Sequence, residues 1–176
     1  MNPEIEPPDL SHPALNAAQP DGITLTHDLH ATHWRRLAEI MAAALTARDP
    51  ATLARAHAAS FACVYAWDNG KLVGSARAVS DGVLYATIYD VVVDPACQGK
   101  GVGRKLVQNL IDRLPVERIF LTSVPDKQGF YAKLGFLRQT NAMAWYASEA
   151  RSNALARGIL LDHDDVDSPR VLALST

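Results

Sequence analysis

The stretch that decides the fold runs from residue 84 to residue 106 and reads LYATIYDVVVDPACQGKGVGRKL. Its first part, residues 84–93, is apolar at nearly every position from Ile88 onward except Asp90, which predicts a strand covered on both faces. Asp94-Pro95 ends this strand. An amphipathic helix is predicted over residues 101–114 because its apolar residues share one side: Val102, Leu106, Val107, Leu110, Ile111 and Leu114.

A glycine-rich loop joins this strand to this helix. Gly99, Gly101 and Gly103 permit backbone angles that are closed to other residues, and they place no side chain in the way of a ligand. The first N–H groups of a helix have no partner within it, and with the positive end of the dipole they form an anion site. Three basic side chains add positive charge: Lys100, Arg104 and Lys105. The loop therefore suits a pyrophosphate; the alternative is a turn that only starts the helix.

Two familiar phosphate loops fail against this sequence. A Walker loop ends in Gly-Lys-Ser/Thr, whereas Gly103 is followed by Arg104 and Lys105. A Rossmann fingerprint needs a third glycine three residues after the second, and position 104 or 106 is Arg or Leu. If the loop binds a phosphate, it does so within another fold.

The rest of the chain supplies a mixed α/β pattern. Strands are predicted at 23–26, 61–67, 72–79, 118–121, 136–137 and 144–146, and helices at 31–47, 52–59 and 127–134. With the two elements around the loop, the order is β-α-α-β-β-β-α-β-α-β-β. This order predicts a central mixed β-sheet with helices packed on both faces.

Composition bounds the setting. The chain has 176 residues, the common size of one domain. A formal net charge of -2 argues against nucleic acid or an anionic membrane as a partner, and no segment is apolar for long enough to span a bilayer. Cys63 and Cys97 cannot form a disulfide framework, which favours a reducing, cytoplasmic location. Residues 1–20 are expected to be a proline-interrupted arm, 21–146 the domain, and 147–176 an extension that includes a helical stretch at 148–157 and an acidic run at 162–167.

Two segments carry a resemblance to a known family. Gln98-Gly99-Lys100-Gly101-Val102-Gly103 matches the Gln/Arg-x-x-Gly-x-Gly/Ala signature of the GNAT superfamily of N-acetyltransferases. Gly129-Phe130-Tyr131-Ala132-Lys133-Leu134-Gly135-Phe136 resembles the Phe-Tyr-x-x-x-Gly-Phe segment of the same superfamily. The resemblance covers about Ile23 to Tyr146. Residues 86–95 are also similar to the branch that contains plant plastid serotonin N-acetyltransferases and small bacterial relatives.

The resemblance implies acetyl-CoA as co-substrate. Its pyrophosphate would lie on the amides of residues 98–104 and its pantetheine arm beside the end of the strand. Relatives often carry an Asn that touches the pantetheine; here Asp126 or Ser123 would take its place, or the contact is absent. The residues implied in cofactor binding are Val91, Val92, Val93, Gln98, Gly99, Lys100, Gly101, Val102, Gly103, Arg104, Asp126 and Tyr131.

The resemblance also implies how the protons move. Tyr131 stands where the superfamily commonly places the general acid that protonates the departing thiolate; the alternative is an ordinary core tyrosine beside Phe130 and Phe136. Asp90 is the candidate base, against a structural aspartate or a water chain that ends on another carboxylate. By the period of two, Tyr89 is expected on one side of the strand and Asp90 on the other. Tyr89, Trp67 and Ser123 are candidates for contact with the acceptor.

The function that follows is transfer of an acetyl group from acetyl-CoA to a primary amine, by direct attack in a ternary complex. The amine belongs either to a small molecule or to a protein. The alternative is an acyl-CoA-binding regulatory module without catalysis. No metal is expected, since His27, His30 and His33 lack further ligands at suitable spacing. Superfamily members often dimerise, so a homodimer is compatible with the resemblance.

Overall fold

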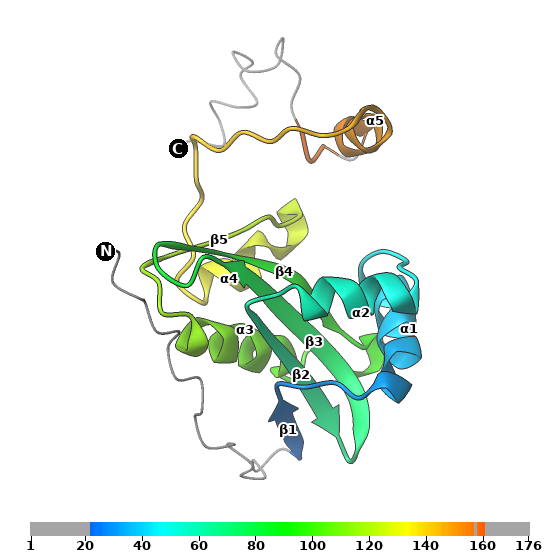
Figure 1. The fold of residues 1–176 in the computed structure, drawn as a ribbon. Coiled ribbons are helices and arrows are strands. Elements are labelled where there is room, and N and C mark those ends of the chain that lie inside the picture. Colours follow the sequence, from blue (N-terminus) through cyan, green and yellow to red (C-terminus); the bar gives the residue numbers. More distant parts are fainter. Residues whose placement is uncertain (1–21, 157, 161–176) are drawn as a thin grey trace, which may run out of the picture. The chain divides into compact units, whose positions relative to one another are not determined.

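The computed structural model describes residues 22–156 and 158–160 (Figure 1). The chain divides into two compact units with the boundary between Thr122 and Ser123, and each unit is described by itself. The boundary falls inside the predicted 21–146 domain, whose limits stay a prediction. The predicted arm at 1–20 and the acidic run at 162–167 lie outside the described residues.

The first unit contains a five-stranded sheet in the order β1-β2-β3-β4-β5. Neighbouring strands are antiparallel, except that β5 runs parallel to β4. The Asn69-Gly70 turn joins β2 to β3 with positive φ values of 47° and 77°, as a tight hairpin requires. The strands are β1 Ile23–Thr26, β2 Ala62–Asp68, β3 Lys71–Ser80, β4 Tyr85–Val93 and β5 Arg118–Leu121.

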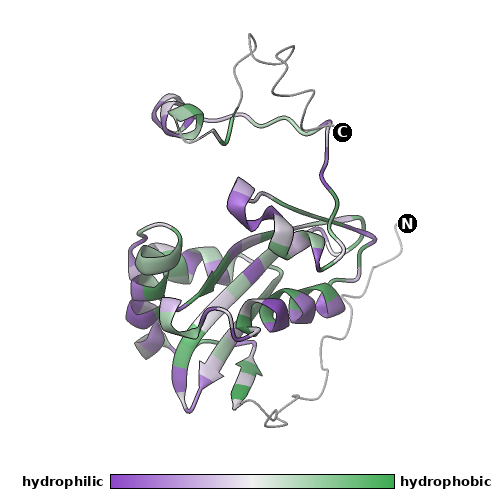
Figure 2. Ribbon diagram, turned by 180° about the vertical axis from the view of Figure 1, so that it is seen from behind, coloured by the Kyte–Doolittle hydropathy of each residue, from purple (hydrophilic) through white to green (hydrophobic). Residues whose placement is uncertain are grey.

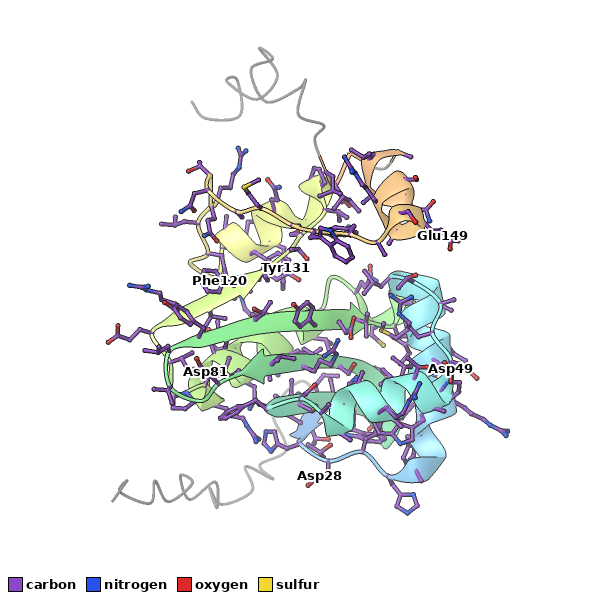
Figure 3. All side chains as sticks on the ribbon, turned by 45° about the horizontal axis from the view of Figure 1, so that its top comes forward. Asp28, Asp49, Asp81, Phe120, Tyr131 and Glu149 are labelled. Atoms are coloured by element: carbon purple, nitrogen blue, oxygen red, sulfur yellow. The ribbon has the colours of Figure 1, made fainter. Side chains whose placement is uncertain are left out.

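Helices cover both faces of this sheet, as the sequence predicted (Figure 3). One face is covered by α1 (Trp34–Ala44), which follows the short helix η1 (Ala31–His33), and by α2 (Pro50–Ala58). The other is covered by α3 (Val102–Arg113), whose hydrophilic residues face away from the sheet in Figure 2. A core cluster joins the α1–α2 layer to the sheet: Leu37, Ile40, Met41, Leu53, Tyr65, Leu72 and Val92.

Strand β4 differs from its prediction in one respect. It is covered on both faces only at Val92 and Val93, whereas from Tyr85 to Tyr89 more exposed and buried side chains alternate, and Asp90 and Val91 are both half-buried. Tyr85 and Tyr89 are exposed, and Ile88 is buried. One face of β4 is therefore partly exposed although its sequence is mostly apolar, because tyrosine is accommodated at solvent-exposed as well as at buried positions.

The second unit contains η3 (Pro125–Lys127), α4 (Gln128–Ala132) and α5 (Ser148–Ala156). The predicted strands at 136–137 and 144–146 are wrong, because both segments are irregular. Leu137 and Trp145 are 93% and 88% exposed. A strand forms only where a neighbouring strand pairs with it, and a short apolar run cannot specify such a partner.

Candidate functional site

The predicted phosphate loop lies between β4 and α3 with its backbone open to solvent. Gly99 and Gly101 have φ values of 76° and 82°, in the left-handed region that favours glycine. A Cβ atom built on either would meet no atom within 4 Å. The backbone conformation, and not crowding by the protein, therefore requires glycine at both positions, and the space over them is free for a ligand.

Hydrogen bonds fix the start of the loop to the end of β4 and to its neighbours. Gln98 donates from Nε2 to the carbonyl oxygen of Val93 at 3.0 Å. Asp94 donates its N–H to Val73 O at 2.7 Å, and its carboxylate accepts from Ala96 N at 3.0 Å and from Arg36 of α1. The Ala96 N–H, and then the Arg36 guanidinium, lower the pKa of Asp94. The loop thus leaves the sheet from a fixed base.

Helix α3 begins at this loop with a bare N-terminus. Its N-cap residue is Gly101, which has no side chain to cap the first N–H groups, and its first turn contains no acidic residue. The helical ladder begins with Lys105 N to Gly101 O at 3.1 Å. Lys100 and Arg104 are exposed beside it. Open amides, a dipole end and basic side chains together fit a bound pyrophosphate.

The edge of β4 next to β5 is paired along only part of its length. The parallel ladder ends at the pair Ile88–Leu121, while β4 itself continues to Val93. In the first unit as described, the segment Val91–Val93 therefore runs past the end of its β5 ladder. Such an edge can add hydrogen bonds to an extended ligand.

A β-bulge interrupts β4 at Asp90, where φ is 51°. Asp90 Oδ2 accepts from Arg77 Nε of β3 at 2.6 Å, and the Arg77 guanidinium lies 5.1 Å from the centre of the Tyr89 ring. The expectation that Tyr89 and Asp90 point to opposite sides is wrong, because the bulge breaks the period of two and both side chains meet Arg77.

In the first unit, the predicted acceptor residues Tyr89 and Trp67 lie at different positions along the sheet. Tyr89, which is 41% exposed, is the cross-strand partner of Arg77, whereas Trp67 is the cross-strand partner of Leu72, further along the sheet. The Trp67 indole donates to Thr26 Oγ1 at 2.8 Å, which gives it a structural role. In the second unit, Ser123 Oγ donates to Val124 O at 3.1 Å, and Asp126 pairs with Lys127 at 2.8 Å on the surface.

Tyr131 lies in α4, within an aromatic group of the second unit. Its ring makes edge contacts with Phe130 and Phe136, at centroid distances of 4.9 and 5.9 Å. Burial raises the pKa of Tyr131, so that the phenol keeps its proton at neutral pH. It is therefore in the protonation state that a general acid needs.

The sequence did not single out a buried polar cluster under α2. His57 Nδ1 and Tyr65 OH are 2.8 Å apart, and Cys63 Sγ donates to His57 O at 3.5 Å. Burial, assisted by the positive charge of Arg77, lowers the pKa of His57 to about 4. A histidine in an alanine-rich helix gives no sequence signal of this, because burial depends on the strand that packs beneath it.

The described residues include no group of three or more His, Cys, Asp or Glu side chains that could hold a metal ion. Of the predicted histidine series, His27 Nε2 lies 3.1 Å from Asn109 Oδ1, and His33 makes an edge contact with Trp67. Among the same residues, no helix is both long and apolar enough to cross a membrane.

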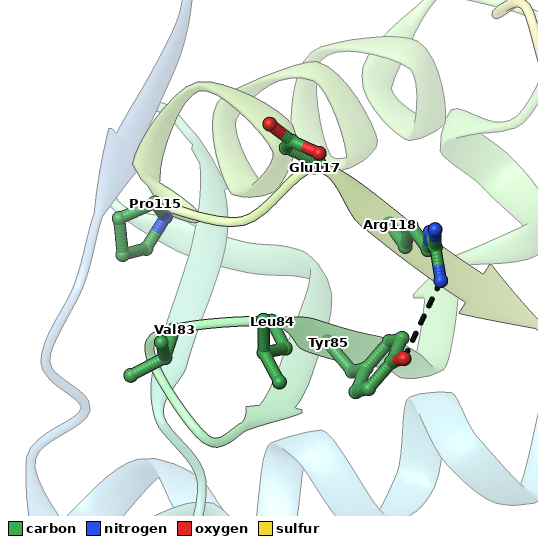
Figure 4. Close-up of a pocket in the computed structure, with 6 residues that line it drawn as sticks. All are labelled: Val83, Leu84, Tyr85, Pro115, Glu117 and Arg118. Carbon is green, nitrogen blue, oxygen red and sulfur yellow. Dashed lines mark hydrogen bonds between the residues drawn. The ribbon is translucent and has the colours of Figure 1, made fainter.

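A pocket of about 470 Å³ opens at the start of β4 (Figure 4). Tyr85 and Arg118 meet across it, with 3.4 Å between the hydroxyl and Nη1. None of the predicted site residues lines this pocket, which lies at the opposite end of β4 from the loop. Its lining is Val83, Leu84, Tyr85, Pro115, Glu117 and Arg118.

Comparison with known proteins agrees with this geometry. A sequence model of the acetyltransferase (GNAT) family matches residues 27–136. An uncharacterised N-acetyltransferase of Pyropia yezoensis is 44% identical over 84 residues, covering 44% of this chain and 48% of that protein. Serotonin N-acetyltransferase 2, chloroplastic, of Oryza sativa subsp. japonica is 44% identical over 85 residues, covering 45% and 42%. The match thus spans less than half of either relative.

A solved structure gives the same result for the fold. The ribosomal-protein-alanine N-acetyltransferase of Escherichia coli superposes with a TM-score of 0.58 at 27% identity. The superposition covers 67% of this chain and 79% of that one.

Proposed function

The chain belongs to the acetyltransferase (GNAT) family, and we propose that it moves an acetyl group from acetyl-CoA to a primary amine by direct attack in a ternary complex. The observation that carries this proposal is the loop between β4 and α3, where left-handed glycines leave the amides open beside basic side chains. The curated relatives named N-acetyltransferases support the acyl transfer.

The loop would hold the pyrophosphate. Its amides and the α3 dipole oppose two negative charges, and Gln98 ties the loop to the end of β4 through Val93 O. Each amide is oriented before the ligand arrives, so little ordering is needed on binding. The residues proposed for this contact are Gln98, Gly99, Lys100, Gly101, Val102, Gly103 and Arg104.

The part of β4 beyond the end of the β5 ladder would receive the pantetheine arm. Val91, Val92 and Val93 continue past the end of the β5 ladder, and an extended chain with amide groups can pair with such an edge as a short strand does. A backbone N–H of this segment would then polarise the thioester carbonyl, because a fixed donor opposes the negative charge that develops on that oxygen during attack.

Two groups would move the protons. A primary ammonium has a pKa near 10 and attacks only after it loses a proton, whereas the departing thiolate leaves more easily when an acid protonates it. We assign the acid to Tyr131, whose pKa is raised by burial. The sequence predicts Asp90 as the base, but its carboxylate is engaged by Arg77, so the proton of the ammonium would pass through a water chain to another carboxylate.

The acceptor follows less directly from the residues. Tyr89 exposes an aromatic ring on the face of the sheet that α1 and α2 partly cover, and the match to a serotonin N-acetyltransferase makes an arylalkylamine the first acceptor to test. Polyamines, amino acids, peptide lysines and peptide N-termini are the other classes of primary amine.

The test is thiol release from acetyl-CoA by the full chain, with one member of each amine class in turn. We expect release well above the amine-free rate with at least one class, and equal amounts of free thiol and acetylated amine. If acetyl-CoA binds and no class raises the rate, the chain is an acyl-CoA-binding module. Release that is independent of amine would indicate a hydrolase.

A further inference from the structure

The bulge in β4 has two unusual features at one residue. In the antiparallel ladder, Arg77 faces Tyr89 and Ser75 faces Val92, so that Ala76 alone stands opposite both Asp90 and Val91. Asp90 takes up the extra residue with a φ of 51°. This conformation is costly for a residue with a side chain, although Asp and Asn tolerate it better than most.

Arg77 holds Asp90 in this conformation. The pair is 2.6 Å long and mostly buried, with 16% of the Arg77 side chain and 21% of the Asp90 side chain exposed. The guanidinium is itself fixed, since Nη1 donates to Ser60 Oγ at 3.4 Å and the group lies over the Tyr89 ring. A planar cation fixed on several sides can orient a carboxylate in a way that a flexible one cannot.

The position of the bulge connects it to the site. It lies two residues after Ile88, where the β5 ladder ends, and directly before Val91–Val93, where the proposed donor arm pairs with β4. A bulge bends its strand and redirects the groups that follow it. The orientation of the Val91 and Val92 backbone therefore depends on the conformation of Asp90.

We propose that Arg77 and Asp90 are positioning residues, and that their ion pair maintains the β4 bulge that aims the strand backbone at the thioester. This inference rests on the proposed acetyl transfer, and it gives Asp90 a conformational role in place of a proton-accepting one. Asp90 acts through its backbone angles, and its carboxylate serves to hold them.

Three substitutions at Asp90 separate the two roles. Asn keeps both an acceptor for Arg77 and tolerance of positive φ, Gly keeps only the backbone freedom, and Ala keeps neither. A positioning role predicts that turnover decreases in the order Asp90→Asn, Asp90→Gly, Asp90→Ala. Turnover of Asp90→Asn is expected within about threefold of wild type, and that of Asp90→Ala about tenfold or more below wild type. A base predicts an equal loss of about 10²–10⁴-fold in all three.

Two further readouts exclude a merely structural effect. The acid limb of the kcat/KM profile is expected to persist in Asp90→Asn, whereas removal of the base would abolish it. The KM for acetyl-CoA and kcat are to be compared separately, because a backbone N–H that no longer points at the thioester carbonyl lowers kcat. Equal loss in Asn and Ala, together with loss of the acid limb, would overturn the proposal.

Arg77 provides a rescue test. Arg77→Met leaves Asp90 without its cation, and turnover is expected to fall about tenfold or more, while Arg77→Lys retains the charge and loses less. Adding Asp90→Gly to Arg77→Met removes both the strained residue and the unpaired charge, so the double variant is expected to recover activity over Arg77→Met. A double variant as low as the product of the two single losses would contradict the proposal.

The state of the bulge can also be read without any turnover, which separates this inference from the proposed function. The backbone amide resonances of residues 89–92 are expected to stay near their wild-type positions in Asp90→Asn and to shift in Asp90→Ala. If wild type acetylates no amine while this pattern holds, the proposed function fails and the conformational role of the pair stands. Identical shifts in both variants would refute that role.

Discussion

At the scale of single residues, the role proposed for Tyr131 is the easiest to isolate, because one oxygen atom distinguishes it from phenylalanine. Its aromatic contacts with Phe130 and Phe136 are ring-to-ring edge contacts, and phenylalanine keeps the ring. The ring packing should therefore survive when the hydroxyl is removed, and any loss of turnover can be assigned to the missing proton donor.

We predict that Tyr131→Phe lowers kcat by about 10²-fold or more and leaves the affinity for acetyl-CoA nearly intact. Steady-state thiol release and calorimetric titration measure the two quantities. Phe130→Tyr serves as a control for added or removed hydroxyls in the same helix and should keep most of the turnover. An unchanged kcat in Tyr131→Phe would remove the acid from the mechanism.

His57 makes the stability of the fold depend on pH. It is neutral in the folded chain because burial lowers its pKa from 6.5 to about 4, whereas in the unfolded chain it gains a proton near pH 6.5. The stabilisation is therefore complete above pH 6.5 and is lost as the pH falls towards 4. A shift of this size corresponds to about 3 kcal/mol across that interval.

We predict that the free energy of unfolding falls by about 2 kcal/mol between pH 7 and pH 5, and that His57→Gln removes most of this fall. Urea unfolding at the two pH values provides the measurement. His30→Gln, the same replacement at an exposed histidine, serves as the control for the substitution itself. A slope that His57→Gln does not alter would assign the pH dependence to other groups.

At the scale of elements, the sequence predicted correctly those strands and turns that depend on neighbouring residues alone. Strands β1 and β5 have their predicted bounds, and the Asn-Gly turn fixed the β2–β3 hairpin. The segments at 136–137 and 144–146 had the same apolar character and formed no strand. Pairing depends on a partner that is distant in the chain, and a two- or three-residue run cannot encode it.

In the candidate site, too, locally determined features were predictable and features that depend on distant pairing were not. Gly99 and Gly101 were predictable because positive φ restricts the residue type locally, whereas Gly103 lies inside α3 and has no positive φ. The bulge was not predictable, since it inserts one residue into a ladder whose register no local pattern records. A signal existed nonetheless: Arg77 is the one charge in β3 after its first residue, Lys71, and Asp90 is the one charge in β4. Lone opposite charges on adjacent apolar strands are expected to pair.

At the scale of the whole molecule, a near-neutral chain contains a local cationic site. The net charge of -2 gave no indication of an anionic ligand, yet Lys100 and Arg104 lie exposed beside open amides at the start of α3. Affinity for acetyl-CoA should then depend on the conformation of this loop far more than on total charge, because salt screens the interaction between exposed charges that are more than about 10 Å apart.

One pair of variants isolates that site. Gly101 and Gly70 have φ values of 82° and 77°, and a Cβ on either meets no atom within 4 Å. Glutamate therefore introduces a similar backbone strain and the same charge at both positions, but Gly70 lies in the β2–β3 turn and Gly101 at the proposed pyrophosphate site. A loss of stability alone would appear equally in both variants.

The most direct measurement is calorimetric titration of acetyl-CoA into wild type, Gly101→Glu and Gly70→Glu, with ATP and NAD as competing ligands for wild type. We predict that wild type binds acetyl-CoA better than ATP or NAD, that Gly70→Glu binds it nearly as well, and that Gly101→Glu loses about 10²-fold or more in affinity. Tight binding of acetyl-CoA to Gly101→Glu, or no preference for it in wild type, would contradict the account.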